Sequence, residues 1–375
     1  MTTAFDIPSL AAAQLPPERW SERVFSRFGT ALDSTVLRAM QLVVERALIP
    51  DPEDMMALRD SAHTLLDPDL QRHPERFFRF LEEPVTPLRT SSRLQRDWVG
   101  GVAVRRMFAT AYRPYTVQGE SAADEASLRH PILVEHWMHR PGPPRGTVLT
   151  LHGFTMGRPR FDAVALFASH WFRRGLDVAL MTLPQHGERK PPEARFSGEC
   201  FAVPHVARLG EAVREAIYEI RVVTRWLSER SAAPVGVLGL SLGGYLTALL
   251  AGLCDDPDFV IPMVPPACFG DLAWRFFTET RHYRKGGAPA LSREELRAAF
   301  RIHSPLAHPL RVPKRKLLII AGRGDRIVPP EHPAALWQHW GQPDIHWFSG
   351  SHLAPFGRRR IVDAIVRHLE SLDIL

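Results

Sequence analysis

The feature that most constrains the fold is an alternation of apolar runs and helix-type segments that begins near residue 96. Mostly apolar runs at 147–151, 177–183 and 259–264 are separated by segments whose apolar residues recur at helical spacing. Strands that are apolar on both faces need cover on both faces, and the intervening helices fit the crossovers of parallel strands. The sequence therefore predicts an α/β domain over residues 96–375, with a mostly parallel central sheet and helices on both faces.

Further elements complete this series. Two early strands are expected to pair antiparallel at one edge of the sheet, at 101–108 and 132–138. Later strands are expected at 235–240, 316–321 and 344–348. Helices are expected at 161–174, 207–229, 242–253, 333–340 and 358–369. The series indicates a single sheet built over most of the chain.

Two regions depart from this alternation. Residues 1–95 have almost no β-like runs and predict helices at 34–48, 52–59 and 73–81. Leaving their phenylalanines in water would be costly, so we expect a packed helical N-terminal extension and not a loose arm. Residues 267–312 predict a cap-like insert, whose aromatic side chains either line an acyl pocket or pack the insert itself.

Composition narrows the class of protein. The chain has 375 residues, of which 45% are hydrophobic, and no apolar run of about 18 residues predicts a membrane span. The first residues lack the basic start and apolar centre of a secretory signal. Its three cysteines predict neither a disulfide framework nor a zinc site, which favours the cytoplasm.

The charge pattern indicates whether a nucleic acid is an expected partner. The net charge is +6, but the basic clusters are short and scattered and no aromatic stripe accompanies them. We therefore expect a solvated basic surface and no nucleic-acid partner. The chain also lacks Gly-x-Gly-x-x-Gly, a phosphate-binding Gly-Lys-Ser/Thr and His-Glu-x-x-His, so no cofactor or metal is expected.

One motif points to chemistry. The apolar run 235–240 leads into Gly239-Leu240-Ser241-Leu242-Gly243 and then directly into a helix-forming segment. A serine at such a strand-to-helix turn has its hydroxyl exposed at the edge of the sheet. Ser241 is the candidate nucleophile, and because a serine hydroxyl is weak on its own, it requires a base and an acid that orients the base.

On such a scaffold the acid and the histidine follow the serine in that order, each just beyond a strand. Asp325 lies in a glycine-bracketed turn after the run 316–321, and Asp271 is the alternative acid. His352 lies in a glycine-containing loop after 344–348. His346 falls inside that strand and His339 inside a helix, so His352 is the candidate base.

The developing oxyanion needs two backbone N–H donors. One is expected from Leu242, which follows the nucleophile. The other is expected from Phe154, in the loop after the strand 147–151, where Gly153 lets the chain approach the substrate. His152 is interpreted as a structural histidine bonded to backbone, because the site already has a base.

These segments together resemble the α/β-hydrolase superfamily. The similar parts are 151–154, 183–189, 239–244, 322–325 and 350–352, which span roughly residues 100–370. The segment Leu-Pro-x-His-Gly-x-Arg at 183–189 is similar to one in bacterial esterase-like and dienelactone-hydrolase-like members, where the resemblance implies a loop that borders the pocket. His186 and Arg189 could bind a substrate carboxylate or hold this loop, and we favour the structural role.

The sequence thus predicts a serine hydrolase that cleaves a carboxylic-ester-like bond of a small-molecule acyl substrate through an acyl-enzyme. The alternative is an acyltransferase or another non-hydrolytic member of the same fold. The N-terminal helices could in addition bind a protein partner.

Overall fold

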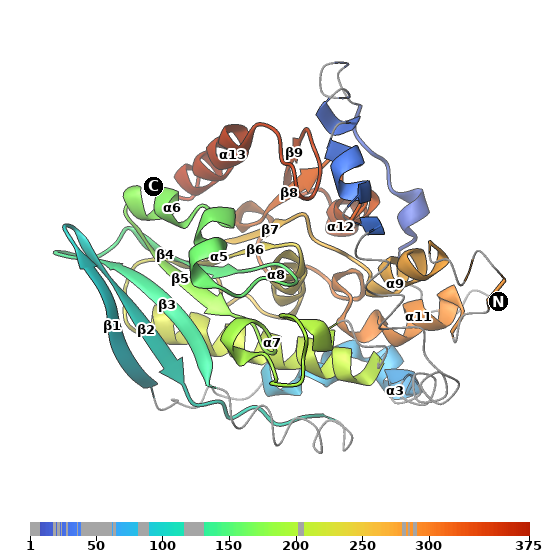
Figure 1. Ribbon diagram of the computed structural model, residues 1–375, viewed down its shortest axis with the longest axis horizontal. Coiled ribbons are helices and arrows are strands. Elements are labelled where there is room, and N and C mark those ends of the chain that lie inside the picture. The colour runs from blue at the N-terminus through green and yellow to red at the C-terminus, as the bar shows by residue number, and fades with distance from the viewer. Residues whose placement is uncertain are drawn as a thin grey trace.

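The computed structural model describes residues 8–17, 20, 23, 25–27, 29–35, 37–38, 62, 65–81, 90–115, 131–201, 206–279, 283, 286–287 and 291–375. A nine-stranded sheet crosses the molecule in the order β1-β2-β3-β5-β4-β6-β7-β8-β9 (Figure 1). The strands from β5 to β9 in this order pair in parallel. The predicted α/β class, with a mostly parallel sheet, is confirmed.

The strands are β1 (Thr90–Trp98), β2 (Gly101–Phe108), β3 (Ile132–His139), β4 (Gly146–Leu151), β5 (Leu176–Thr182), β6 (Val235–Leu240), β7 (Val260–Met263), β8 (Leu318–Gly322) and β9 (Asp344–Phe348). β2 pairs antiparallel with β3 at one edge, as the sequence predicts. β1 is the outermost strand and pairs antiparallel with β2. The sequence did not indicate β1, so the boundary placed at residue 95 falls inside a strand.

The α-helices are α3 (Pro68–Arg72), α5 (Pro159–Ala165), α6 (Ala168–Arg173), α7 (Val206–Ser228), α8 (Leu242–Leu253), α9 (Phe269–Thr278), α11 (Arg293–Ala299), α12 (Glu331–His339) and α13 (Arg358–Glu370). Short 3₁₀ helices are η1 (Leu10–Ala12), η2 (Pro74–Leu81), η3 (Gly187–Arg189), η4 (Glu199–Phe201), η5 (Arg301–His303), η6 (Pro305–Ala307) and η7 (Lys314–Lys316).

The helices cover both faces of the sheet because successive strand residues point to opposite sides. Leu149 of β4 packs in a core cluster with α7 and α8, whereas its neighbour Val148 packs in a second cluster with α6 and α13. A third cluster joins β8 to α12 and η1. The sheet is therefore buried on both faces from β5 to β8, whereas β9 at its edge is only partly buried.

Some helices differ from expectation. The helix predicted at 161–174 is divided into α5 and α6, because Phe167 adopts a left-handed backbone with φ of 56°. The segment predicted at 73–81 is the 3₁₀ helix η2, with non-helical torsions at Phe78. Of the helix predicted at 34–48, only residues 34, 35, 37 and 38 are described, and these are helical; the helix predicted at 52–59 lies outside the described residues.

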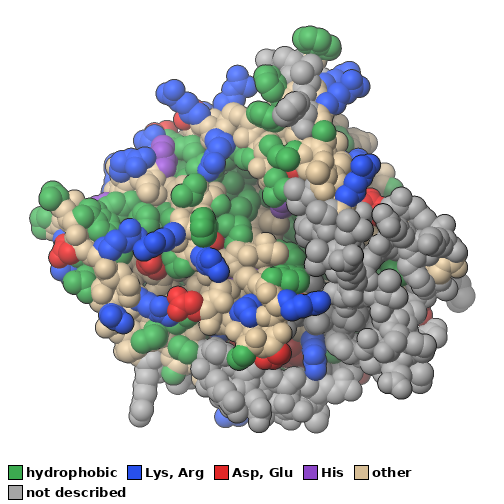
Figure 2. Space-filling model, in the orientation of Figure 1, with side chains coloured by type: hydrophobic (Ala, Val, Ile, Leu, Met, Phe, Trp, Pro, Cys, Tyr) green, Lys and Arg blue, Asp and Glu red, His purple; other side chains and the backbone are tan. Residues whose placement is uncertain are grey.

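The N-terminal helical segment, by which we mean the described residues in 25–38, lies near α9 and α12 at the side of the molecule where β8 and β9 lie (Figure 1). Figure 2 shows Lys and Arg side chains spread over the visible face, with hydrophobic side chains between them. Within the described part of the chain, no helix has both the length and the apolar character that crossing a membrane requires.

Candidate active site

Ser241 occupies a sharp turn between β6 and α8. Its backbone has φ of 56° and ψ of −110°, a conformation that is costly for a residue with a side chain. The turn is tight enough to require glycine on both sides. A Cβ on Gly239 would lie 2.1 Å from the Gly243 carbonyl oxygen, and a Cβ on Gly243 would lie 2.2 Å from the Leu151 carbonyl oxygen. The glycines of the motif thus let the serine reach the carboxyl edge of the sheet.

His352 and Asp325 lie beside this serine. His352 follows β9, and its Nε2 is 2.9 Å from Ser241 Oγ. Its Nδ1 is 2.6 Å from Oδ2 of Asp325, which follows β8. The second oxygen of Asp325 accepts the N–H groups of Ile327 at 2.9 Å and Val328 at 2.7 Å. Loops after parallel strands meet at one edge of the sheet, and here they bring the three predicted residues into one hydrogen-bonded chain.

The His352 ring and the Asp325 carboxylate each shift the pKa of the other. Burial lowers the pKa of His352, but the charge and hydrogen bond of Asp325, together with the charge of Asp33, outweigh it, so that the pKa is raised. Burial raises the pKa of Asp325, and His352 opposes that shift. An ionised carboxylate only accepts hydrogen bonds, so His352 Nδ1 is the donor and a neutral ring presents the lone pair of Nε2 to Ser241.

The two predicted oxyanion donors flank Ser241. Leu242 is the first residue of α8, so its N–H has no partner within the helix. A Cβ built on Gly153 would lie 3.5 Å from Ser241 Cβ, which places the loop that carries Phe154 directly beside the serine. That loop is fixed to α8 by the Gly243 N–H, which donates to the His152 carbonyl at 3.1 Å. Donation by Leu242 and Phe154 to an oxyanion stays a prediction.

His152 has a structural environment. It is fully buried, and burial lowers its pKa to about 3. Its Nε2 accepts the Leu183 N–H at 3.1 Å, so Nδ1 carries the proton and donates to the Gly153 carbonyl at 2.9 Å. The neutral ring therefore joins the loop after β4 to the loop after β5, in agreement with the structural interpretation.

His186 and Arg189 likewise form hydrogen bonds with other groups of the protein. The Arg189 guanidinium donates to both carboxylate oxygens of Glu219 at 2.6 Å and to the Thr182 carbonyl at 3.0 Å. His186 is buried, with Nδ1 2.8 Å from the Pro184 carbonyl oxygen. These contacts hold the loop after β5 and favour the structural role over binding of a substrate carboxylate.

The alternative acid lies elsewhere. Asp271 is in α9, where it forms ion pairs with Arg293 at 2.7 Å and with Arg297. It therefore connects α9 to α11 within the insert, and the carboxylate beside His352 is that of Asp325.

The aromatic residues of the insert form two groups. Phe269 packs on Tyr245 of α8 with ring centroids 4.1 Å apart. Trp274, Phe277 and Tyr283 contact one another, with centroid separations between 5.5 and 6.4 Å. The first group packs the insert against α8, and the second group packs residues of the insert against one another.

One residue at the site could not be predicted from the sequence. Asp33, in the N-terminal helical segment, is fully buried. Its carboxylate accepts the backbone N–H groups of His352 at 2.9 Å, Leu353 at 3.1 Å and Arg326 at 3.0 Å. No motif surrounds Asp33, and all three partners are backbone groups about 300 positions away, so a local pattern could not have identified it.

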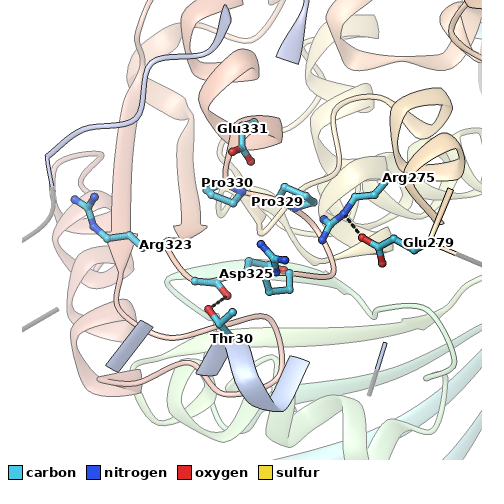
Figure 3. A pocket seen from close by; sticks show the side chains of 10 residues that line it. Thr30, Arg275, Glu279, Arg323, Asp325, Pro329, Pro330 and Glu331 are labelled. Atoms are coloured by element: carbon cyan, nitrogen blue, oxygen red, sulfur yellow. Dashed lines mark hydrogen bonds and ion pairs between the residues drawn. The ribbon is translucent and has the colours of Figure 1, made fainter. Parts of the chain in front are cut away.

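A pocket of about 410 Å³ lies beside Asp325 (Figure 3). It is lined by Thr30 of the N-terminal helical segment, by Asp325 and Arg326, and by Arg275 and Glu279 at the end of α9. Arg275 and Glu279 form an ion pair at 3.1 Å. Neither Ser241 nor His352 is among the described residues that line this pocket, so it adjoins the candidate site from the side of the acid.

Similarity to a known family covers the centre of the chain. Residues 159–274 match the family described as alpha/beta hydrolase domain containing 18. This region runs from α5 into α9 and includes Ser241.

Curated relatives match a longer part. The uncharacterized protein Rv2627c of Mycobacterium tuberculosis strain H37Rv is 32% identical over 244 residues, which are 62% of this chain and 55% of the relative. The uncharacterized protein MT2702 of strain CDC 1551 gives the same values. The chain thus spans about half the length of the curated relatives that it matches.

Solved structures share the fold. The acetyl xylan esterase from Paenibacillus sp. R4 is 13% identical, with a TM-score of 0.55 and coverage of 86% of this chain and 96% of that chain. Acetyl xylan esterase 1 from Thermoanaerobacterium sp. JW/SL YS485 is 14% identical, with a TM-score of 0.53 and coverage of 86% and 95%. At these identities the likeness concerns the fold alone.

Proposed function

We propose that the chain is a member of the α/β-hydrolase superfamily and, within it, a serine hydrolase that cleaves an ester-like bond of a small acyl substrate. The similarity to the family and to the fold of esterases supports hydrolysis in general. The serine mechanism rests on one observation: Ser241 Oγ, His352 and Asp325 are joined by hydrogen bonds of 2.9 and 2.6 Å.

In the first half of the proposed reaction, Ser241 Oγ attacks the carbonyl carbon of the ester. The hydroxyl proton moves to His352 Nε2, and the ionised Asp325 stabilises the imidazolium. The carbonyl oxygen becomes an oxyanion, for which the N–H groups of Leu242 and Phe154 are the proposed donors. His352 then returns the proton to the leaving alcohol, and the acyl group stays on Ser241.

In the second half, water replaces the alcohol. The water oxygen attacks the acyl carbon while His352 Nε2 takes a proton from the water. Collapse of the second tetrahedral intermediate breaks the bond to Ser241 Oγ, which recovers its proton from His352. This half consumes one water and yields the carboxylic acid and the free enzyme, so the whole reaction converts the ester and one water into an acid and an alcohol.

The test uses a fluorophosphonate probe, which phosphonylates activated serines, and a panel of p-nitrophenyl esters of graded chain length. The unaltered protein should be labelled and should turn over at least one ester. Ser241→Ala should abolish the labelling and lower turnover by at least about 10³-fold, because the nucleophile is lost while the fold is kept.

Ser228→Ala is the matched control. Ser228 lies at the end of α7, near the opposite end of β6 from Ser241, and its hydroxyl donates to the Thr224 carbonyl. This variant should be labelled like the unaltered protein. Persistent labelling of Ser241→Ala, or an unaltered protein that neither reacts with the probe nor cleaves any ester, would contradict the proposal.

A further inference from the structure

The Asp33 carboxylate lies where two loops of the site meet. It is fully buried, and both of its oxygens are used. Oδ2 accepts the N–H of His352 from the loop after β9 and the N–H of Arg326 from the loop after β8. Oδ1 accepts the N–H of Leu353. One carboxylate thus bonds the backbone of the candidate base and the residue that follows the candidate acid.

The segment around Asp33 fits closely against the same two loops. Thr30 Oγ1 is 3.0 Å from the carbonyl oxygen of Gly324, the residue before Asp325. A Cβ on Gly29 would lie 2.8 Å from the backbone nitrogen of Ser351, the residue before His352. The N-terminal helical segment therefore contacts both loops over more than one turn, and the Asp33 bonds are part of a packed interface.

We propose that Asp33 is a positioning residue that holds the loops carrying Asp325 and His352 in register, and this inference rests on the function proposed above. A hydrogen bond to a carboxylate is stronger than one between neutral groups, and three of them converge here. Fixing both loops to one buried group keeps His352 Nε2 at hydrogen-bond distance from Ser241 Oγ. A shift of about 1 Å in such geometry is enough to lower a rate about 100-fold.

The charge of Asp33 also acts on the site. Among the residues that the structure describes, the ionisable groups that act on His352 are Asp325, from the loop after β8, and Asp33, from the N-terminal helical segment; the Arg326 side chain is exposed. Both carboxylates raise the pKa of His352, while burial lowers it. Removal of the Asp33 charge therefore lowers the pKa of His352, and the neutral base persists to lower pH.

The test is Asp33→Asn in the full chain. The amide keeps the size of the side chain, removes the charge and leaves one acceptor oxygen in place of two. We expect kcat for a p-nitrophenyl ester and the fluorophosphonate labelling rate to fall about 10- to 100-fold with KM little changed. We also expect the acid limb of the pH profile to move to lower pH, a shift that a purely structural role would not produce.

Two control variants separate these effects. Ser34→Ala alters the neighbouring residue, whose hydroxyl bonds only the Thr30 carbonyl of its own segment among the described contacts. Asp97→Asn removes the same charge from exposed β1, at the opposite edge of the sheet from β9. Both should keep the rate and the acid limb of the unaltered protein. An Asp33→Asn protein with unchanged rate and unchanged acid limb overturns the proposal.

A measurement on the unaltered protein covers the case in which Asp33→Asn does not fold. The amide hydrogens of Arg326, His352 and Leu353 should exchange with solvent at least about 100-fold more slowly than unbonded loop amides, because the buried carboxylate accepts them. Exchange at the rate of open loops overturns the positioning role. This readout needs no turnover, so it distinguishes failure of this inference from failure of the proposed hydrolase activity, which the probe reports.

Discussion

At the scale of single residues, the site depends on backbone positions as much as on side chains. Ser241 is held in a costly conformation, and Gly239 and Gly243 are the residues that make that conformation possible. Strain of this kind persists only where the surroundings impose it. Here the Ser241 N–H donates to Met263 of β7 at 2.9 Å, and the Tyr245 N–H donates to the Ser241 carbonyl at 2.8 Å. The strand and the helix therefore enforce the turn from both sides.

The pH dependence of activity belongs to this scale. His352 must be neutral to accept the serine proton, and its pKa is raised above its ordinary value of 6.5. The rate should therefore fall as the pH decreases through a value above 6.5, since protonation removes the base. The measurement is the fluorophosphonate labelling rate between pH 5 and 9, compared with the Asp97→Asn control. An acid limb centred below pH 6.5 would contradict the raised pKa.

The sequence predicted the three side chains that follow strands, but not Asp33, which bonds the backbone of the loops that carry two of them. Ser241, Asp325 and His352 each stand in a glycine-containing turn just after an apolar run, and that local pattern is readable without a structure. Asp33 has no such pattern. Its role depends on backbone groups that come within hydrogen-bond distance only after the whole sheet has formed.

At the scale of elements, apolar strands could be predicted and polar or interrupted elements could not. β1 has the sequence TSSRLQRDW, is largely exposed, and pairs with a neighbour on one side only. Polar and charged residues on an edge strand discourage pairing with other chains, and they also remove the alternation that reveals a strand. The division between α5 and α6 occurs at Phe167, without a glycine or proline to indicate it.

The loop after β5 offers a test at the element scale. Arg189 of η3 and Glu219 of α7 form a buried ion pair that joins the loop to the helix. Glu219→Gln should destabilise the fold by up to about 3–5 kcal/mol, because the buried guanidinium then keeps only one carboxylate contact, the longer one with Glu215 at 3.8 Å. The measurement is the free energy of unfolding from denaturant titration.

The matched variant for this test is Glu229→Gln, just beyond α7, where the carboxylate is exposed and its contact with Arg230 is 3.9 Å. It should change the free energy of unfolding by less than about 1 kcal/mol. Equal effects of the two variants would show that the Arg189–Glu219 pair does not hold the loop.

At the scale of the whole molecule, the N-terminal helical segment packs against the two loops that carry the candidate acid and base. Its described residues contact the loops after β8 and β9 through Thr30 and Asp33. Removal of residues 1–35 should therefore lower the labelling rate at least as much as Asp33→Asn does. The measurement uses monodisperse protein whose far-UV circular dichroism confirms that the sheet is kept. A truncated protein that is labelled as fast as the full chain would show that the site forms without residues 1–35.

The contact between Asp33 and His352 also has a consequence for synthesis. The two residues are separated by 319 positions, which a ribosome covers in tens of seconds at about 5–20 residues per second. Asp33 is thus made long before its partners at His352 and Leu353. A nascent chain that already contains Ser241 still lacks the base and both loops that Asp33 joins. A nascent chain that ends before His352 therefore cannot yet form the contacts that join Asp33 to the two loops of the candidate site.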